Sequence, residues 1–150
     1  MKKLVLSLIV AAMSVSTFAQ SYEYKIITVI ESIVPMGLGR SRIIENKREV
    51  SASDLTTPRT DGRTSRQREV SRSDAKINKF EETTLLNFYS GVGINFQNIA
   101  SNDAIITAKI MEVVENGWEL AFALSGVESN CGEGDGKGIY ITLLVFKRKL

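Results

Sequence analysis

No histidine occurs among the 150 residues, and the chain holds one cysteine and two prolines. Without histidine there is no Ser-His-Asp or Cys-His catalysis, no imidazole base and no His-ligated metal. The single cysteine, Cys131, cannot form an internal disulfide bond. The hydrophobic content of 43% is ordinary for a globular protein. We therefore expect a folded protein that is not an enzyme and that carries no cofactor.

The first nineteen residues have the layout of a secretory signal peptide. Lys2 and Lys3 precede an apolar run, and the small residues Thr17 and Ala19 occupy the positions that a signal peptidase reads. The run is short and polar for a membrane span. We expect cleavage after Ala19, export to the periplasm or the cell exterior, and a soluble mature chain over 20–150 with no transmembrane segment.

The bulk charge of +2 belongs to the leader. Loss of Lys2 and Lys3 leaves 17 basic residues against the 17 acidic ones, so the mature chain is neutral. A neutral chain offers no general electrostatic attraction to nucleic acid or to a membrane surface. We expect no nucleic-acid partner.

Local patterns predict three strands and one helix. Residues 22–31 are rich in aromatic and β-branched side chains, 118–124 alternate strictly, and 139–147 are apolar on both faces. Capping residues at 101–103 and an apolar stripe at helical spacing predict a helix over about 103–116. Asn116-Gly117 then ends that helix with a left-handed residue.

These elements predict an α+β fold. A single helix packs on a three-stranded antiparallel sheet, in the order β-α-β-β, with the last strand in the middle. We expect the helix to cover the face that bears Trp118, Leu120 and Phe122. The other face then needs a cover from residues 85–97 or from a second protomer; its side chains are Tyr140, Leu144 and Phe146.

Residues 40–84 differ in composition from the rest and predict an exposed polar insertion within a single domain over 20–150. From Arg40 to Lys79 there are eleven basic and six acidic residues. The heptapeptide Arg48–Asp54 recurs as Arg68–Asp74 with six of seven positions identical. Asp61-Gly62, a tight-turn signal, lies midway between the copies. We expect a long exposed hairpin or a mobile loop.

Two blocks of the chain resemble a small bacterial domain of unknown function, family 4177. The residues that carry the resemblance are Tyr22-Glu23-Tyr24-Lys25, the corner Glu115-Asn116-Gly117-Trp118-Glu119-Leu120, and the terminal strand from Tyr140 to Lys147. The match covers 22–31 and 103–148, and about 70 residues are inserted between the two blocks. The resemblance implies the fold and brings no catalytic residues.

Two groups of side chains are candidate binding sites. The insertion contains basic residues suited to an acidic partner surface: Arg59, Arg63, Arg66, Arg68 and Arg72. The glycine-rich loop 128–138 has three carboxylates that can ligate Ca²⁺, although their spacing fits no EF-hand or calcium repeat: Glu128, Glu133 and Asp135.

The sequence therefore predicts an exported, non-enzymatic interaction module that binds a protein or envelope partner. Its partner surface is the basic insertion, and a second copy of the chain is one candidate partner. The alternative is an exported small-ligand or Ca²⁺-binding protein that uses the acidic loop 128–138.

Overall fold

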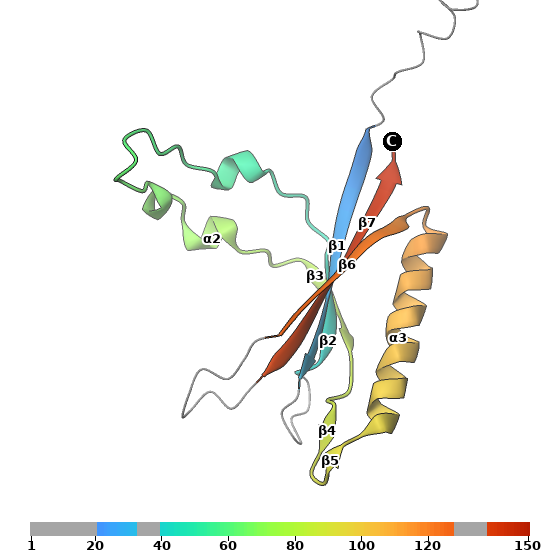
Figure 1. Ribbon diagram of the computed structural model, residues 1–150. Helices are drawn as coiled ribbons and strands as arrows, with labels where there is room; N and C mark the ends of the chain where they lie inside the picture. The colour runs from blue at the N-terminus through green and yellow to red at the C-terminus, as the bar shows by residue number, and fades with distance from the viewer. Residues whose placement is uncertain (1–20, 33–39, 128–137) are drawn as a thin grey trace, which may run out of the picture.

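The computed structural model of the protein describes residues 21–32, 40–127 and 138–150. Within these residues the main elements are a five-stranded antiparallel sheet and one long helix, α3 (Figure 1). The sheet has the strand order β3-β2-β1-β7-β6. Its strands are β1 (Tyr22–Ser32), β2 (Arg42–Asn46), β3 (Phe80–Thr84), β6 (Glu119–Val127) and β7 (Ile139–Lys149). The helix is α3 (Phe96–Glu115), and a small separate hairpin is formed by β4 (Tyr89–Ser90) and β5 (Gly93–Ile94).

The expected sheet of three strands is wrong, because the sheet has five and the described residues hold seven strands in all. The two additional sheet strands are β2 and β3, which lie at the two ends of the polar insertion. They pair with each other, and β2 also pairs with β1. β3 reads Phe-Glu-Glu-Thr-Thr and has no apolar periodicity. Pairing with β2, rather than burial, makes this segment a strand.

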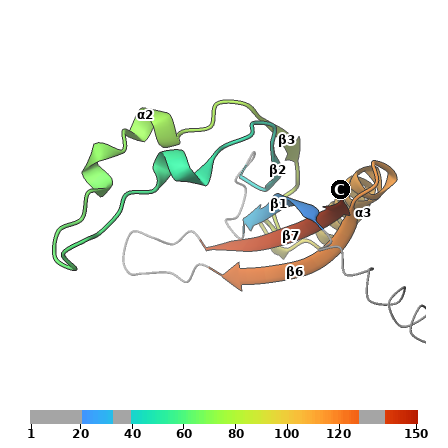
Figure 2. The same ribbon diagram turned by 90° about the horizontal axis from the view of Figure 1, so that it is seen from above.

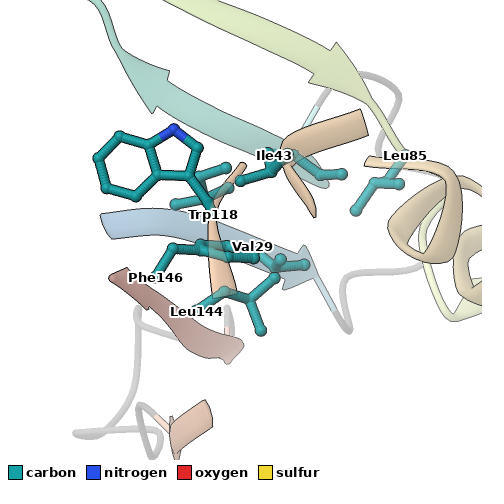
Figure 3. Close-up of a cluster of buried hydrophobic side chains, with 8 residues drawn as sticks. Val29, Ile43, Leu85, Trp118, Leu144 and Phe146 are labelled. Atoms are coloured by element: carbon teal, nitrogen blue, oxygen red, sulfur yellow. The ribbon is translucent and has the colours of Figure 1, made fainter. Parts of the chain in front are cut away.

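The hydrophobic core lies between α3 and one face of the sheet. Phe146 and Ile27 are fully buried, and Val113 of α3 belongs to the same cluster. Figure 3 shows Trp118, Leu144 and Phe146 side by side in this cluster. Three half-buried isoleucines of α3 complete the layer: Ile105, Ile106 and Ile110. Trp118 is 7% exposed, which confirms that it fills the corner between α3 and β6.

The expected assignment of the sheet faces is right for Trp118 and Leu120 but wrong for Phe122, Leu144 and Phe146. Leu144 and Phe146 lie under α3, whereas Phe122 is 61% exposed on the opposite face. A register shift between Leu120 and Phe122 explains the reversal. This β-bulge places Leu120 beside Phe146 on the helix side and moves Phe122 to the other side. Phe88 contacts Tyr140 with ring centroids 5.7 Å apart, so the segment before α3 covers one end of the helix side.

Helix α3 begins seven residues earlier than expected. Asn95 is its N-cap, and its side chain accepts a hydrogen bond from the backbone N–H of Asn98. The polar residues that suggested a later start serve other contacts, since Asn102 is buried and bonds to both backbone groups of Leu86. At the other end Gly117 has φ +83°, which confirms the left-handed residue that ends the helix.

Residues 47–79 form an arm that leaves the sheet between β2 and β3. In both views the arm extends away from the sheet on the side opposite α3 (Figures 1 and 2). It carries three single helical turns: η1 (Ala52–Leu55), η2 (Gln67–Glu69) and α2 (Arg72–Ala75). None of the residues in these turns is buried.

Candidate functional site

The repeated heptapeptide gives the two legs of the arm the same local structure. Ser51 and Ser71 are both extended N-cap residues, and each precedes a helical turn. The hydroxyl of Ser51 shares a hydrogen bond with Ser53, and that of Ser71 shares one with Ser73. A serine at an N-cap favours the start of a turn because its oxygen competes for nearby backbone N–H groups. The direct repeat therefore places a serine before a helical turn in each leg, and of the two only the Ser71 side chain caps its turn, by accepting from the backbone N–H of Ser73.

Short-range hydrogen bonds shape the rest of the arm. At its tip the carboxylate of Asp61 accepts hydrogen bonds from the backbone N–H groups of Arg63 and Thr64, and Gly62 has φ +68°. Further back, the Gln67 side chain donates to the hydroxyl of Thr57 at 2.8 Å and connects the legs. At the root the backbone N–H of Lys47 donates to the carbonyl of Lys79. The arm is thus a hairpin-like excursion held by its own bonds.

The arm carries all five of the arginines expected to face a partner, and all five are exposed: Arg59, Arg63, Arg66, Arg68 and Arg72. Arg66 pairs with Glu69 at 2.8 Å on the surface of the arm. Nine basic and five acidic residues lie in 47–79, so the arm has a net charge of +4. The structure places the arginines on one projecting element without gathering them into a pocket.

A second polar feature, the Glu45 cluster, lies between the sheet and the C-terminal half of α3. Glu45 is 3% exposed, and its carboxylate lies 2.8 Å from Nζ of Lys109. Lys25 and Lys47 each approach the other carboxylate oxygen to 3.1 Å. Beside the cluster, Lys25 and Arg148 lie over the ring of Trp118, at 4.8 and 4.5 Å from its centroid.

The Glu45 cluster holds fixed charges and is poorly suited to proton transfer. Burial alone raises the pKa of Glu45, but hydrogen bonds from Lys109, Lys25 and Lys47 outweigh it and lower the pKa to about 2. Burial lowers the pKa of Lys109, and its hydrogen bonds with Glu45 and Glu112 reverse this and raise it. A general acid or base works best with a pKa near the operating pH. The cluster is therefore suited to anchoring α3 on the sheet.

The third feature is an uncovered apolar sheet face, here called the open face. Strand register places ten uncharged residues at its centre: Tyr24, Ile26, Thr28, Ile30, Ile44, Phe122, Leu124, Ile141, Leu143 and Val145. Four of them are more than half exposed: Tyr24, Ile26, Phe122 and Leu124. No helix or strand of the described ranges packs on this face. A shallow hollow of about 440 Å³ lies at its far end, lined by residues 124–127 with Ile141 and Leu143.

Charges surround the open face, while its centre has none. Lys147 and Glu119 form an ion pair at the end of the face near Tyr24. Arg42 and Glu82 form another at the side nearest β3. A second hollow, of about 590 Å³, lies where Tyr24 and Ile26 meet the first residues of the arm. The open face and the arm thus adjoin each other.

The candidate Ca²⁺ ligands Glu128, Glu133 and Asp135 lie outside the described residues, as does Cys131. Within 21–32, 40–127 and 138–150 no group of three or more His, Cys, Asp or Glu side chains is arranged to hold a metal ion. In the same ranges no helix is both long and apolar enough to cross a membrane. Comparison of the chain with protein-family models, curated proteins and solved structures finds no match.

Sequence reasoning missed the Glu45 cluster and the open face. The cluster joins side chains from positions 25, 45, 47 and 109, which no local pattern connects. The open face was assigned to the helix because Phe122 and Trp118 share a parity in the sequence. Only the bulge separates them, and a bulge has no clear signal in Glu119-Leu120-Ala121-Phe122.

Proposed function

We propose that the protein is an exported, non-enzymatic interaction module whose arm binds an acidic surface on another protein of the cell envelope. The observation that carries the proposal is the exposure of five arginines on an arm that projects from the sheet. Export rests on the layout of residues 1–19. The resemblance to the domain family 4177 is compatible with this role, because that family brings no catalytic residues.

The composition of the arm favours a protein partner. Arginine offers a planar group with five donors that pairs with carboxylates in two-point contacts. Serines and threonines separate the arginines, and no aromatic residue lies between 47 and 79 to stack on nucleobases. Opposite charge across an interface mainly raises the association rate and selects the partner. An arm of net charge +4 is suited to that task.

Site-specific photocrosslinking in a bacterium that exports the chain tests the proposal. In the test variant a photoreactive residue replaces Thr64, near the tip of the arm. In the matched control it replaces Thr107, an exposed position of α3. We expect a crosslinked protein at Thr64 only, and its crosslinked peptide should be rich in Asp and Glu.

Two charge variants of the arm complete this experiment. Changing all five arginines to glutamine should reduce the Thr64 crosslink at least about tenfold, since each exposed ion pair contributes up to about 1 kcal/mol. Changing the same five to lysine keeps the charge and should retain most of the crosslink. Crosslinks to lipid alone, or equal yields from the two arm variants, would contradict an acidic protein partner.

A further inference from the structure

The open face is a surface that a partner must cover, and we infer that its partner is a second copy of the same chain. Two sheets then pack face to face and form a β-sandwich with α3 on each outer side. This inference uses the sheet face and not the arm, so it stands or falls separately from the proposed function.

The first argument is the two-sided apolar character of β1 and β7. On β7, Leu144 and Phe146 point to the helix side, and Leu143 and Val145 point to the open face. On β1, Ile27 is buried under α3 while its neighbour Ile26 is 52% exposed. An antiparallel sheet with one face in water alternates apolar and polar residues along its strands, and these positions of β1 and β7 lack that alternation. Within the described chain only one of these faces has a cover.

The second argument is area. The four most exposed side chains of the open face offer roughly 100 Å² each, since a whole aromatic side chain buries about 150–250 Å². With the six half-buried neighbours, the apolar centre reaches about 600 Å², at the upper limit of the largest patch on a typical monomer. Each partner of a standard stable interface contributes about 800 Å², so the apolar centre alone supplies most of the area that a dimer needs.

The third argument is charge. The centre of the open face carries none, so two copies meet there without repulsion and without unpaired buried ions. Two pairs of rim charges are neutralised within each copy, Lys147–Glu119 and Arg42–Glu82. An apolar centre with a polar rim is the usual anatomy of a protein interface. A surface of this kind needs no complementary partner of opposite charge and is self-complementary.

The distribution of these charges also selects the orientation. Lys147 and Lys149 lie at the Tyr22 end of the sheet, whereas at the other end Arg42 lies beside Ile30 and pairs with Glu82. A two-fold axis perpendicular to the strands puts Lys147 and Lys149 of the two copies at opposite ends of the interface, so these like charges do not meet. Aligned sheets pack at about −30° because each is twisted. The dimer is therefore antiparallel, and the two arms leave from opposite ends.

Analytical ultracentrifugation of the purified exported chain, over a range of concentrations, tests the inference. We expect a dimer for the wild-type chain. Ile26→Lys and Leu124→Lys, made singly, should each weaken the dimer at least about 100-fold, because a charge then faces the apolar centre. Matched controls lie on the outer side of α3: Val114→Lys and Met111→Lys change apolar residues that are 47% and 56% exposed, against 52% and 57% at the test positions. These controls should remain dimeric.

Circular dichroism establishes that each variant is folded, so that loss of the dimer is not loss of the fold. A wild-type chain that stays monomeric up to about 100 µM would overturn the inference. A dimer that survives Ile26→Lys would also overturn it, because that result would indicate pairing through the β6 edge. Loss of the dimer in the α3 variants would overturn it as well. Native mass spectrometry that finds one chain with a bound apolar ligand would identify a different occupant and equally overturn it.

Discussion

Glu45 is held inside the protein by three lysines that come from three different elements or their ends. Lys25 lies on β1, Lys47 follows β2, and Lys109 lies on α3. The carboxylate therefore ties the helix to the central strands of the sheet. Removing one member of a buried ion pair is costly because it leaves the other charge without its partner.

We predict that Glu45→Gln lowers the free energy of unfolding at neutral pH by about 3 kcal/mol. The pKa of Glu45 is depressed from its ordinary value of 4.5 to about 2, so its stabilisation is complete above pH 4.5 and is lost as the pH falls towards 2. The difference between wild type and variant should shrink over the same interval. Urea unfolding followed by circular dichroism at several pH values measures both effects.

Glu82→Gln is the control for this prediction. Glu82 forms an exposed ion pair with Arg42, and such pairs contribute at most about 1 kcal/mol. If Glu45→Gln lowered the free energy of unfolding no more than Glu82→Gln does, the ion pairs of Glu45 with the three lysines would not stabilise the fold more than an exposed pair.

At the level of single elements, the corner between α3 and β6 depends on Gly117. Its φ of +83° lies in the left-handed region, and its N–H donates to the carbonyl of Val114. A Cβ there would lie 3.9 Å from the Arg148 side chain, an ordinary contact. The cost of a larger residue therefore comes from the backbone and not from crowding.

We predict that Gly117→Ala lowers the free energy of unfolding by about 1–2 kcal/mol, measured by urea unfolding. Gly126→Ala serves as the control. Gly126 lies within β6, has no left-handed φ, and has open space around the position of a Cβ. That variant should be neutral or slightly stabilising, because alanine loses less freedom in a strand than glycine. Equal losses at the two glycines would contradict the role of the left-handed corner.

The elements with their own local signals were predictable from the sequence. β1 and β7 begin at or beside their expected residues, and α3 ends at the expected Asn116-Gly117 corner. β2 and β3 were not predicted as strands, because Phe80-Glu81-Glu82-Thr83-Thr84 becomes a strand only through its neighbour. The predicted start of α3 was too late because Asn102 resembles an N-cap residue. In the structure its side chain instead forms hydrogen bonds with the backbone of Leu86.

Of the candidate sites, only the one that depends on local composition could be predicted from the sequence. The exposed arginines follow from composition alone, since a polar stretch with few apolar residues has nothing to bury. The Glu45 cluster and the open face follow from strand register and from one bulge. A single bulged residue reverses which side chains face the helix, and no periodicity in the sequence records it.

At the scale of the whole molecule, the arm is an appendage that the core does not need. Its turns contain no buried residue, and the arm is connected to the sheet through β2 and β3 and the Lys47–Lys79 bond. A long excursion of this kind costs loop-closure entropy and returns few contacts.

We predict that deleting residues 50–76 leaves the fold intact and raises the free energy of unfolding by about 1 kcal/mol, because a much shorter loop then joins β2 to β3. Replacing the same residues with a Gly/Ser linker of equal length is the control, and it should leave stability nearly unchanged. Thermal and urea unfolding measure both. A loss of stability on deletion would show that the arm supports the core.

Trp118 is the only tryptophan of the chain. Its indole lies in the buried cluster on the helix side of the sheet, with Phe146 and Leu144 (Figure 3), and Lys25 and Arg148 both approach its ring. The molecule therefore contains one tryptophan fluorophore, whose emission reports the packing of α3 on the sheet. Unfolding can therefore be followed in an unlabelled sample by exciting this indole rather than the four tyrosines.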